Sequence, residues 1–421
     1  MNYRRVLRVT SGYLLWTTYQ LRGLDPKSLR FRLSLWSILH FIIVALIYAV
    51  SFGHHFERSS LLKIALDLSP FLKNLMILHI WLGLKVFIFC IIEWRSLTGV
   101  LNGLVAVLTM KPESEEGSPR NDWRNELLTY LLFFITLTVA FGFGLYIAIE
   151  MDFELPPADH IMIALALFIP HFMLAGSLRL HNLSIWLIRH ELADLQLKLG
   201  LTTVEDKQPV VVEIINPVLK SNEGAVEMAT NIPSEAVTLE TYDKVLKAIQ
   251  AIANYLKSWN GILQRQMFVL NGLNFNCLLY GIFTRIYFEK TWHLVFIGRN
   301  RRVFYAANYV IFACISMDYH LLIIIQMLFD RMKKDFSKEI EKKLSDPKSI
   351  TKEKYEILLE IKRILKEQLN LKLFGLVLFK LWNFFIIISL MLLTIGIIIL
   401  YQYFTDQIDA VAQLMDSNDE D

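Results

Sequence analysis

Residues 381–403 read LWNFFIIISLMLLTIGIIILYQY and hold no charged side chain. A helix needs about 20 apolar residues to cross the roughly 30 Å hydrocarbon core of a bilayer. This stretch is therefore predicted to be a transmembrane helix. It ends in an amide, Gln402, between two tyrosines. A polar side chain costs free energy in hydrocarbon unless it meets a partner or water, so the end of this helix needs an explanation.

The rest of the chain repeats the pattern. Of its 421 residues, 54% are hydrophobic and only 20% are charged, whereas soluble domains have about 25% charged residues. The net charge of +3 excludes the strongly basic field that nucleic-acid binding requires, and no nucleic-acid partner is expected. The three cysteines fall in apolar runs without disulfide or zinc spacing and are predicted to be packing residues: Cys90, Cys277 and Cys314.

Seven apolar runs are long enough to span a membrane: 33–52, 71–92, 127–149, 161–188, 267–288, 303–328 and 381–403. The fourth run contains Pro170, which membrane helices tolerate because neighbours satisfy the freed carbonyl group. The predicted fold class is therefore an all-α membrane protein with seven transmembrane helices and helical cytoplasmic extensions.

Lysine and arginine are distributed unevenly over the connections between these runs. Alternate connections, starting with residues 1–32, carry 33 of these side chains on one side and six on the other. Cytoplasmic loops carry the excess of positive charge. The N-terminus is therefore predicted to be cytoplasmic and the acidic tail, 404–421, extracellular.

Two long cytoplasmic connections carry apolar stripes at helical spacing. Val245, Ile249, Ile252, Leu256, Trp259 and Leu263 follow a heptad-like spacing in a segment that runs into the fifth span without a breaker. Phe329, Met332, Phe336 and Ile340 form a second stripe, and Leu358, Ile361, Leu365 and Leu369 form a third. Two interpretations remain open: a helical hairpin that caps one subunit, or an anchoring bundle where subunits meet.

The end of the last run allows three interpretations of Gln402. It lies at the outer membrane interface, it hydrogen-bonds to a neighbouring helix, or it lines a pore shared by symmetry-related subunits. In the third case the Ile and Leu residues below it would form a hydrophobic gate that closes by dewetting.

The C-terminal stretch KLFGLVLFKLWNFFIIISLMLLTIGIIILYQYF resembles the signature of insect gustatory receptors, a family related to the insect odorant receptors. Gly375, Leu376 and Phe379 match its first part, and Thr394, Gln402 and Tyr403 match its second. The chain departs from the pattern at Ile395, where the family has Tyr. One residue more than in the family separates Ile395 from Gln402, which rotates the helix by about 100°.

The resemblance implies a ligand-gated, nonselective cation channel in the plasma membrane of gustatory sensory neurons, assembled as a homo- or hetero-tetramer of related subunits in membrane lipid. Separately, the sequence holds no motif typical of a nucleotide-binding loop, a metal cluster or a paired-carboxylate site, so no enzymatic activity, cofactor or metal is expected. The seventh helix of each subunit would line the pore, and the cytoplasmic helices would form its anchor. At helical spacing, the expected pore-lining residues are Ile387, Met391, Ile395, Ile398 and Gln402.

The resemblance also implies a pocket for a small-molecule tastant in the outer half of the bundle. Aromatic walls with a few polar groups are typical of small-molecule sites. The candidates at that depth are Trp81, Tyr146, Phe168, His171, Phe172, Tyr280, Phe283, Tyr305, Asn308 and Tyr309. Separately, Asp318 lies in the middle of the sixth span, and Arg179 at similar depth is its expected partner in a buried charge network.

The expected organisation has four parts. Residues 1–328 form a six-helix bundle with the ligand pocket, a mobile loop at 202–236 and a cytoplasmic helix at 240–266. Residues 329–380 form the anchor, 381–403 the pore helix and 404–421 the acidic tail.

The alternative function is a seven-helix receptor that signals through G proteins or a partner subunit, but such receptors place the N-terminus outside. A transporter would show an internal repeat or paired broken helices, which the sequence lacks.

Overall fold

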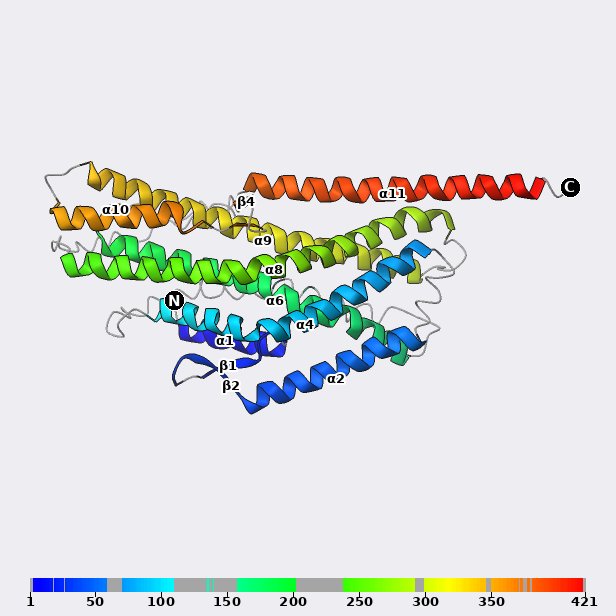
Figure 1. The fold of residues 1–421 in the computed structure, drawn as a ribbon, viewed down its shortest axis with the longest axis horizontal. Coiled ribbons are helices and arrows are strands. Elements are labelled where there is room, and N and C mark those ends of the chain that lie inside the picture. Colours follow the sequence, from blue (N-terminus) through cyan, green and yellow to red (C-terminus); the bar gives the residue numbers. More distant parts are fainter. Residues whose placement is uncertain are drawn as a thin grey trace, which may run out of the picture. The chain divides into compact units, whose positions relative to one another are not determined.

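The described part of the chain consists mainly of long helices in a computed structural model (Figure 1). The structure describes residues 3–17, 19–25, 27–58, 70–109, 135, 139, 157–201, 238–291, 299–345, 350–370, 372–373, 377–378 and 381–418. Its described helices are α1 (Tyr3–Trp16), α2 (Leu35–Arg58), α4 (Pro70–Leu108), α6 (Pro157–Lys198), α8 (Leu239–Thr291), α9 (Arg299–Leu344), α10 (Lys352–Glu367) and α11 (Leu381–Asn418).

The helices confirm the predicted all-α membrane fold. Among the described residues, three helical segments are long and apolar enough to cross a bilayer: Leu35–His54, Ile77–Leu108 and Ala313–Leu344. A shorter apolar segment, Leu392–Thr405, lies in α11. The predicted span at 127–149 lies outside the described residues, apart from 135 and 139.

Two features of the fold differ from the sequence expectation. The first is a pair of small antiparallel hairpins, β1 (Arg22–Asp25) with β2 (Arg30–Leu33), and β3 (Lys372–Leu373) with β4 (Val377–Leu378). The second is the C-terminal segment, because α11 continues past the predicted end at residue 403 as far as Asn418. Hydropathy marks the part of a helix that lies in lipid, and it does not mark where the helical backbone ends.

A glycine permits close packing between α4 and α6. A Cβ atom at Gly83 would lie 2.9 Å from Cγ of Pro170 and 3.2 Å from the hydroxyl of Tyr48. Pro170 is buried inside the unbroken helix α6. The proline ring thus occupies space that any larger residue at position 83 would fill.

The chain divides into two compact units. Unit 1 comprises Met1–Trp186, Ser258–Met327 and Leu371–Asp421, and unit 2 comprises Leu187–Lys257 and Leu328–Asn370. In unit 2, Lys362 of α10 forms an ion pair with Glu341 of α9 at 2.8 Å. Lys343 of α9 donates a hydrogen bond to the carbonyl oxygen of Leu199 at 2.9 Å. These contacts tie the cytoplasmic helices of one chain to each other.

The predicted apolar stripes are buried, with the partial exception of Met332. The buried members are Val245, Ile249, Ile252, Leu256, Trp259, Leu263, Phe329, Phe336, Ile340, Leu358, Ile361, Leu365 and Leu369. They are covered within a single chain, so they do not need a second subunit to remove them from water. The stripes are therefore not evidence for an oligomer, and the hairpin interpretation describes them better.

Candidate functional site

The last helix, α11, has one face that packs on its own bundle. Ile395 is 2% exposed and lies in a cluster with Leu75 of α4 and Leu279 of α8. Ile398 and Ile399 pack against the same cluster. The middle of α11 is therefore held by apolar contacts to two other helices of unit 1.

The opposite side of α11 is a continuous stripe of large apolar side chains, which we call the exposed face. Its residues recur every three or four positions and are all exposed in the single chain: Ile386, Leu390, Leu393, Ile397, Leu400, Phe404 and Ile408. Helical geometry places this stripe about 180° around the helix from Ile395. An apolar face of this length requires lipid, another subunit or a hydrophobic constriction as its surroundings.

The expected pore stripe therefore lies on a different side of α11 from the exposed face. Gln402 is seven residues, or about two turns, beyond Ile395 and shares its side of the helix; it is half-buried. The side chains of Ile387 and Met391 lie outside the described part of the structure. Within one chain the described members of the predicted stripe face the bundle, which differs from the expectation.

A buried polar network links α1, α6 and α9. The structure brings Arg179 and Asp318 together, with Nη2 and Oδ2 4.0 Å apart and both side chains mostly buried. Arg179 also donates a hydrogen bond through Nη1 to the hydroxyl of Tyr13 in α1. A buried cation in an apolar bundle is stable only when it is paired and hydrogen-bonded, and this site supplies both.

A second polar network, which the sequence did not predict, involves Tyr19 in the segment that follows α1. The hydroxyl of Tyr19 donates to Oε1 of Gln266 in α8, and Nε2 of Gln266 donates to Oε2 of Glu93 in α4 at 3.3 Å. Arg265 Nε lies 2.6 Å from Oε1 of the same carboxylate. Glu93 lies one residue beyond the predicted second span. An acidic side chain at the edge of a span needs a polar partner, and this was the feature of the sequence that could have indicated the network.

A buried tryptophan–histidine pair was also missed. The indole Nε1–H of Trp259 donates to Nδ1 of His181 at 3.0 Å, and both side chains are buried. An indole nitrogen can only donate, so Nδ1 of His181 carries no proton. The position of His181 inside the predicted fourth span was the available signal that it needs a buried partner.

The candidate ligand residues divide according to what the structure describes. Trp81 and Tyr309 are 55% and 57% exposed, and Trp81 packs edge-on against Phe52. Tyr146 lies outside the described residues. The remaining candidates lie on α6, α8 and α9 with side chains outside the described part: Phe168, His171, Phe172, Tyr280, Phe283, Tyr305 and Asn308.

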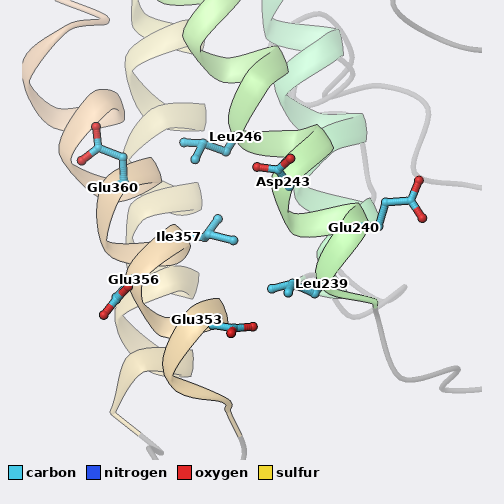
Figure 2. Close-up of a pocket in the computed structure, with 8 residues that line it drawn as sticks. All are labelled: Leu239, Glu240, Asp243, Leu246, Glu353, Glu356, Ile357 and Glu360. Carbon is cyan, nitrogen blue, oxygen red and sulfur yellow. The ribbon is translucent and has the colours of Figure 1, made fainter.

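A pocket of about 640 Å³ lies in unit 2, between the start of α8 and α10 (Figure 2). Three apolar and five acidic side chains line it: Leu239, Glu240, Asp243, Leu246, Glu353, Glu356, Ile357 and Glu360. Lys244 forms an ion pair with Glu240 and holds the pKa of that carboxyl below its ordinary value. Lys247 and Arg363 similarly pair with Asp243 and Glu360 on their own helices. These charges are largely neutralised within their own helices, and the lining is unlike an aromatic small-molecule pocket.

Comparisons with solved structures identify the fold. The insect olfactory receptor OR5 from Machilis hrabei matches with a TM-score of 0.57 and 11% sequence identity, covering 94% of this chain and 98% of the receptor chain. The structure of the same receptor in complex with eugenol matches with a TM-score of 0.57, 13% identity and the same coverage. No family model matches the sequence, and no curated protein matches it.

The match extends over almost the full length of both chains, so it concerns the whole arrangement of helices and not one shared hairpin. At this level of identity the likeness establishes the fold. The chain is a multi-pass membrane protein with the fold of the insect olfactory receptors, as the resemblance of its C-terminal sequence to an insect chemoreceptor family predicted.

Proposed function

We propose that this protein is a chemoreceptor that acts as a ligand-gated, nonselective cation channel, opened by a small-molecule tastant. One observation carries the proposal: the fold agrees with that of an insect olfactory receptor over 94% of the chain. That receptor has also been solved with the small molecule eugenol. The resemblance of the C-terminal signature to gustatory receptors supports a role in taste and a place in the plasma membrane of gustatory neurons.

The proposed ion pathway runs along α11 of each subunit in a tetramer of related chains. The apolar contacts of Ile395 with Leu75 and Leu279 orient this helix on its bundle. That orientation leaves the exposed face, centred on Ile397, available to surround a shared axis. A ring of such isoleucine and leucine side chains excludes water when it narrows, and therefore gates ion flow by dewetting.

The proposed ligand pocket remains the aromatic set in the outer half of the bundle, on α6, α8 and α9. Small-molecule sites between helices of a bundle combine aromatic walls with a few polar groups. Tyr280, Tyr305 and Asn308 would supply the polar groups, and Phe168 and Phe283 the walls.

Ligand-evoked current in cells that express the chain tests this function. The expected result is a cation current that persists when G-protein signalling is blocked, with an N-terminal epitope inaccessible from outside the cell. A surface-expressed protein whose N-terminal epitope is accessible from outside, and whose responses disappear with the G-protein block, would support the alternative receptor. The topology measurement does not depend on knowing the ligand.

A further inference from the structure

The N-terminal part of unit 1 carries a surface that the channel function does not use. On α1, exposed residues recur at positions 5, 9, 12 and 16, which places Arg5, Val9 and Trp16 on one stripe of the helix. Arg8 is exposed beside this stripe. The other side of α1 is buried through residues such as Leu7 and Leu14. The helix is thus held by one face and presents a face with cations at one end and an indole at the other.

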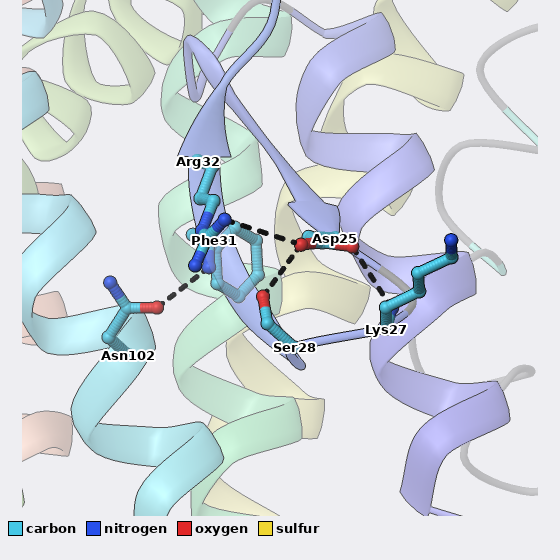
Figure 3. A network of polar contacts seen from close by, with 6 residues as sticks. All are labelled: Asp25, Lys27, Ser28, Phe31, Arg32 and Asn102. Atoms are coloured by element: carbon cyan, nitrogen blue, oxygen red, sulfur yellow. Dashed lines mark hydrogen bonds and ion pairs between the residues drawn. The ribbon is translucent and has the colours of Figure 1, made fainter.

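The hairpin that follows α1 extends this surface. Lys27 and Arg30 are exposed at its turn. The turn is ordered by Asp25, whose carboxylate accepts hydrogen bonds from the backbone N–H of Lys27 at 3.0 Å and the hydroxyl of Ser28 at 2.7 Å (Figure 3). These bonds lower the pKa of Asp25, with that of Ser28 the larger cause.

The hairpin is also attached to the helices beside it. The backbone N–H of Phe31 donates to Oδ1 of Asn102 in α4 at 2.7 Å, and the Phe31 side chain is buried (Figure 3). The backbone N–H of Leu24 donates to the hydroxyl of Ser11 in α1 at 2.8 Å. The cations of the turn are therefore presented from a fixed backbone, and Asp25 is the single acid among residues 1–32.

The surface adjoins a membrane-spanning helix. Leu35 and Trp36 open α2 and are 83% and 81% exposed. His40, one turn further along α2, has Nε2 3.2 Å from the carbonyl oxygen of Trp16. The end of α1 therefore lies beside the first turns of a transmembrane segment. Tryptophan at such a position is typical of the boundary between lipid headgroups and acyl chains.

We infer that Arg5, Arg8, Trp16, Lys27, Arg30 and Trp36 form a docking surface for anionic phospholipid headgroups in the leaflet that faces the N-terminus. The cations complement negatively charged headgroups, each basic residue near an anionic bilayer adding to the attraction. The two indoles and Leu35 seat the surface at the level of the interface. A protein partner would not require the surface to be continuous with the start of a spanning helix.

The test is thermal unfolding of the purified full-length protein in detergent with added phosphatidylserine or phosphatidylcholine. Phosphatidylserine is expected to raise the unfolding temperature more than phosphatidylcholine does. In the variant R8Q/K27Q/R30Q this difference should fall by roughly half or more, since three cations that attract the headgroup are missing. The matched control K244Q/K247Q/K257Q removes three exposed lysines of α8 in unit 2 and should keep the full difference.

A salt series on the unmodified protein provides a second readout if the variant does not fold. Exposed charges are screened as ionic strength rises from 0.1 M to 1 M, where the Debye length falls from about 10 Å to about 3 Å. The advantage of phosphatidylserine should shrink over this range. An unfolding temperature that does not distinguish the two lipids would overturn the inference, as would an equal loss in the control variant or an effect insensitive to salt.

Discussion

The indole of Trp259 is fully buried and donates its single hydrogen bond to His181. This pair joins α8 to α6 inside unit 1, where an unsatisfied polar atom has no water to bond. The indole can only donate, so it fixes Nδ1 of His181 as the acceptor of this hydrogen bond.

We predict that Trp259→Phe destabilises the protein by about 1 to 3 kcal/mol, the cost of leaving a buried acceptor without its donor. Thermal unfolding in detergent measures the change. Trp81→Phe is the matched control, since Trp81 is more than half exposed and should give little effect. Equal loss in both variants would mean that the hydrogen bond contributes nothing specific.

A second prediction for single residues concerns the ion pair of Arg179 and Asp318. Arg179→Met leaves a mostly buried carboxylate without its cation, and the loss of one partner of such a pair typically costs about 3 to 5 kcal/mol. The double variant R179M/D318L removes both charges and should recover much of the loss. Strictly additive effects of the two single substitutions would show that the pair does not interact.

At the scale of elements, the close approach of helices α4 and α6 restricts which residue fits at position 83. The contact between Gly83 of α4 and Pro170 of α6 leaves no room for a methyl group. Gly99, on the same helix, has nothing within 4 Å of a Cβ position. Substitution of Gly99 therefore tests helix propensity alone, whereas substitution of Gly83 in the same helix also tests packing against α6.

We predict opposite signs for alanine at these positions. Gly83→Ala should destabilise by about 1 to 3 kcal/mol through overpacking. Gly99→Ala should stabilise by up to about 1 kcal/mol through helix propensity. The comparison uses the unfolding temperature of each variant, and a stabilised Gly83→Ala protein would show that α4 and α6 do not approach closely here.

The elements themselves were largely predictable from the sequence. Apolar runs gave the described spans, and the spacing of Val245, Ile249 and Ile252 predicted a buried face. The facing of α11 could not be predicted, because one residue rotates a helix by about 100° and only contacts such as Ile395 with Leu75 decide it. The hairpin at Arg22–Leu33 was missed because each strand has only four residues, which is too short for the alternation of Phe31 and Leu33 with arginines to stand out.

At the scale of the whole molecule, the likeness to the olfactory receptor is seen in the arrangement of the helices and hardly at all in the sequence. Identity to the solved olfactory receptor structures is only 11% and 13%, yet the fold agrees over almost the full length. Membrane helices retain their packing while their apolar residues interchange, since many side chains of similar volume fill the same space. The polar contacts between α1 and the bundle, such as Tyr13 with Arg179, could not be predicted from the sequence because they join residues far apart in the chain.

We propose that α11 of each subunit lines the ion pathway with its exposed face. The most direct measurement is modification of Ile397→Cys and Ile395→Cys by a charged thiol reagent during ligand-evoked current, with the unmodified protein as control for its native cysteines. Modification should change the current in Ile397→Cys and leave the current in Ile395→Cys unaffected, because Ile395 packs against Leu75 and Leu279. Current insensitive to modification at position 397, with Ile395→Cys sensitive, would contradict this facing of the helix. Insensitivity at every position of α11 would place the pore elsewhere.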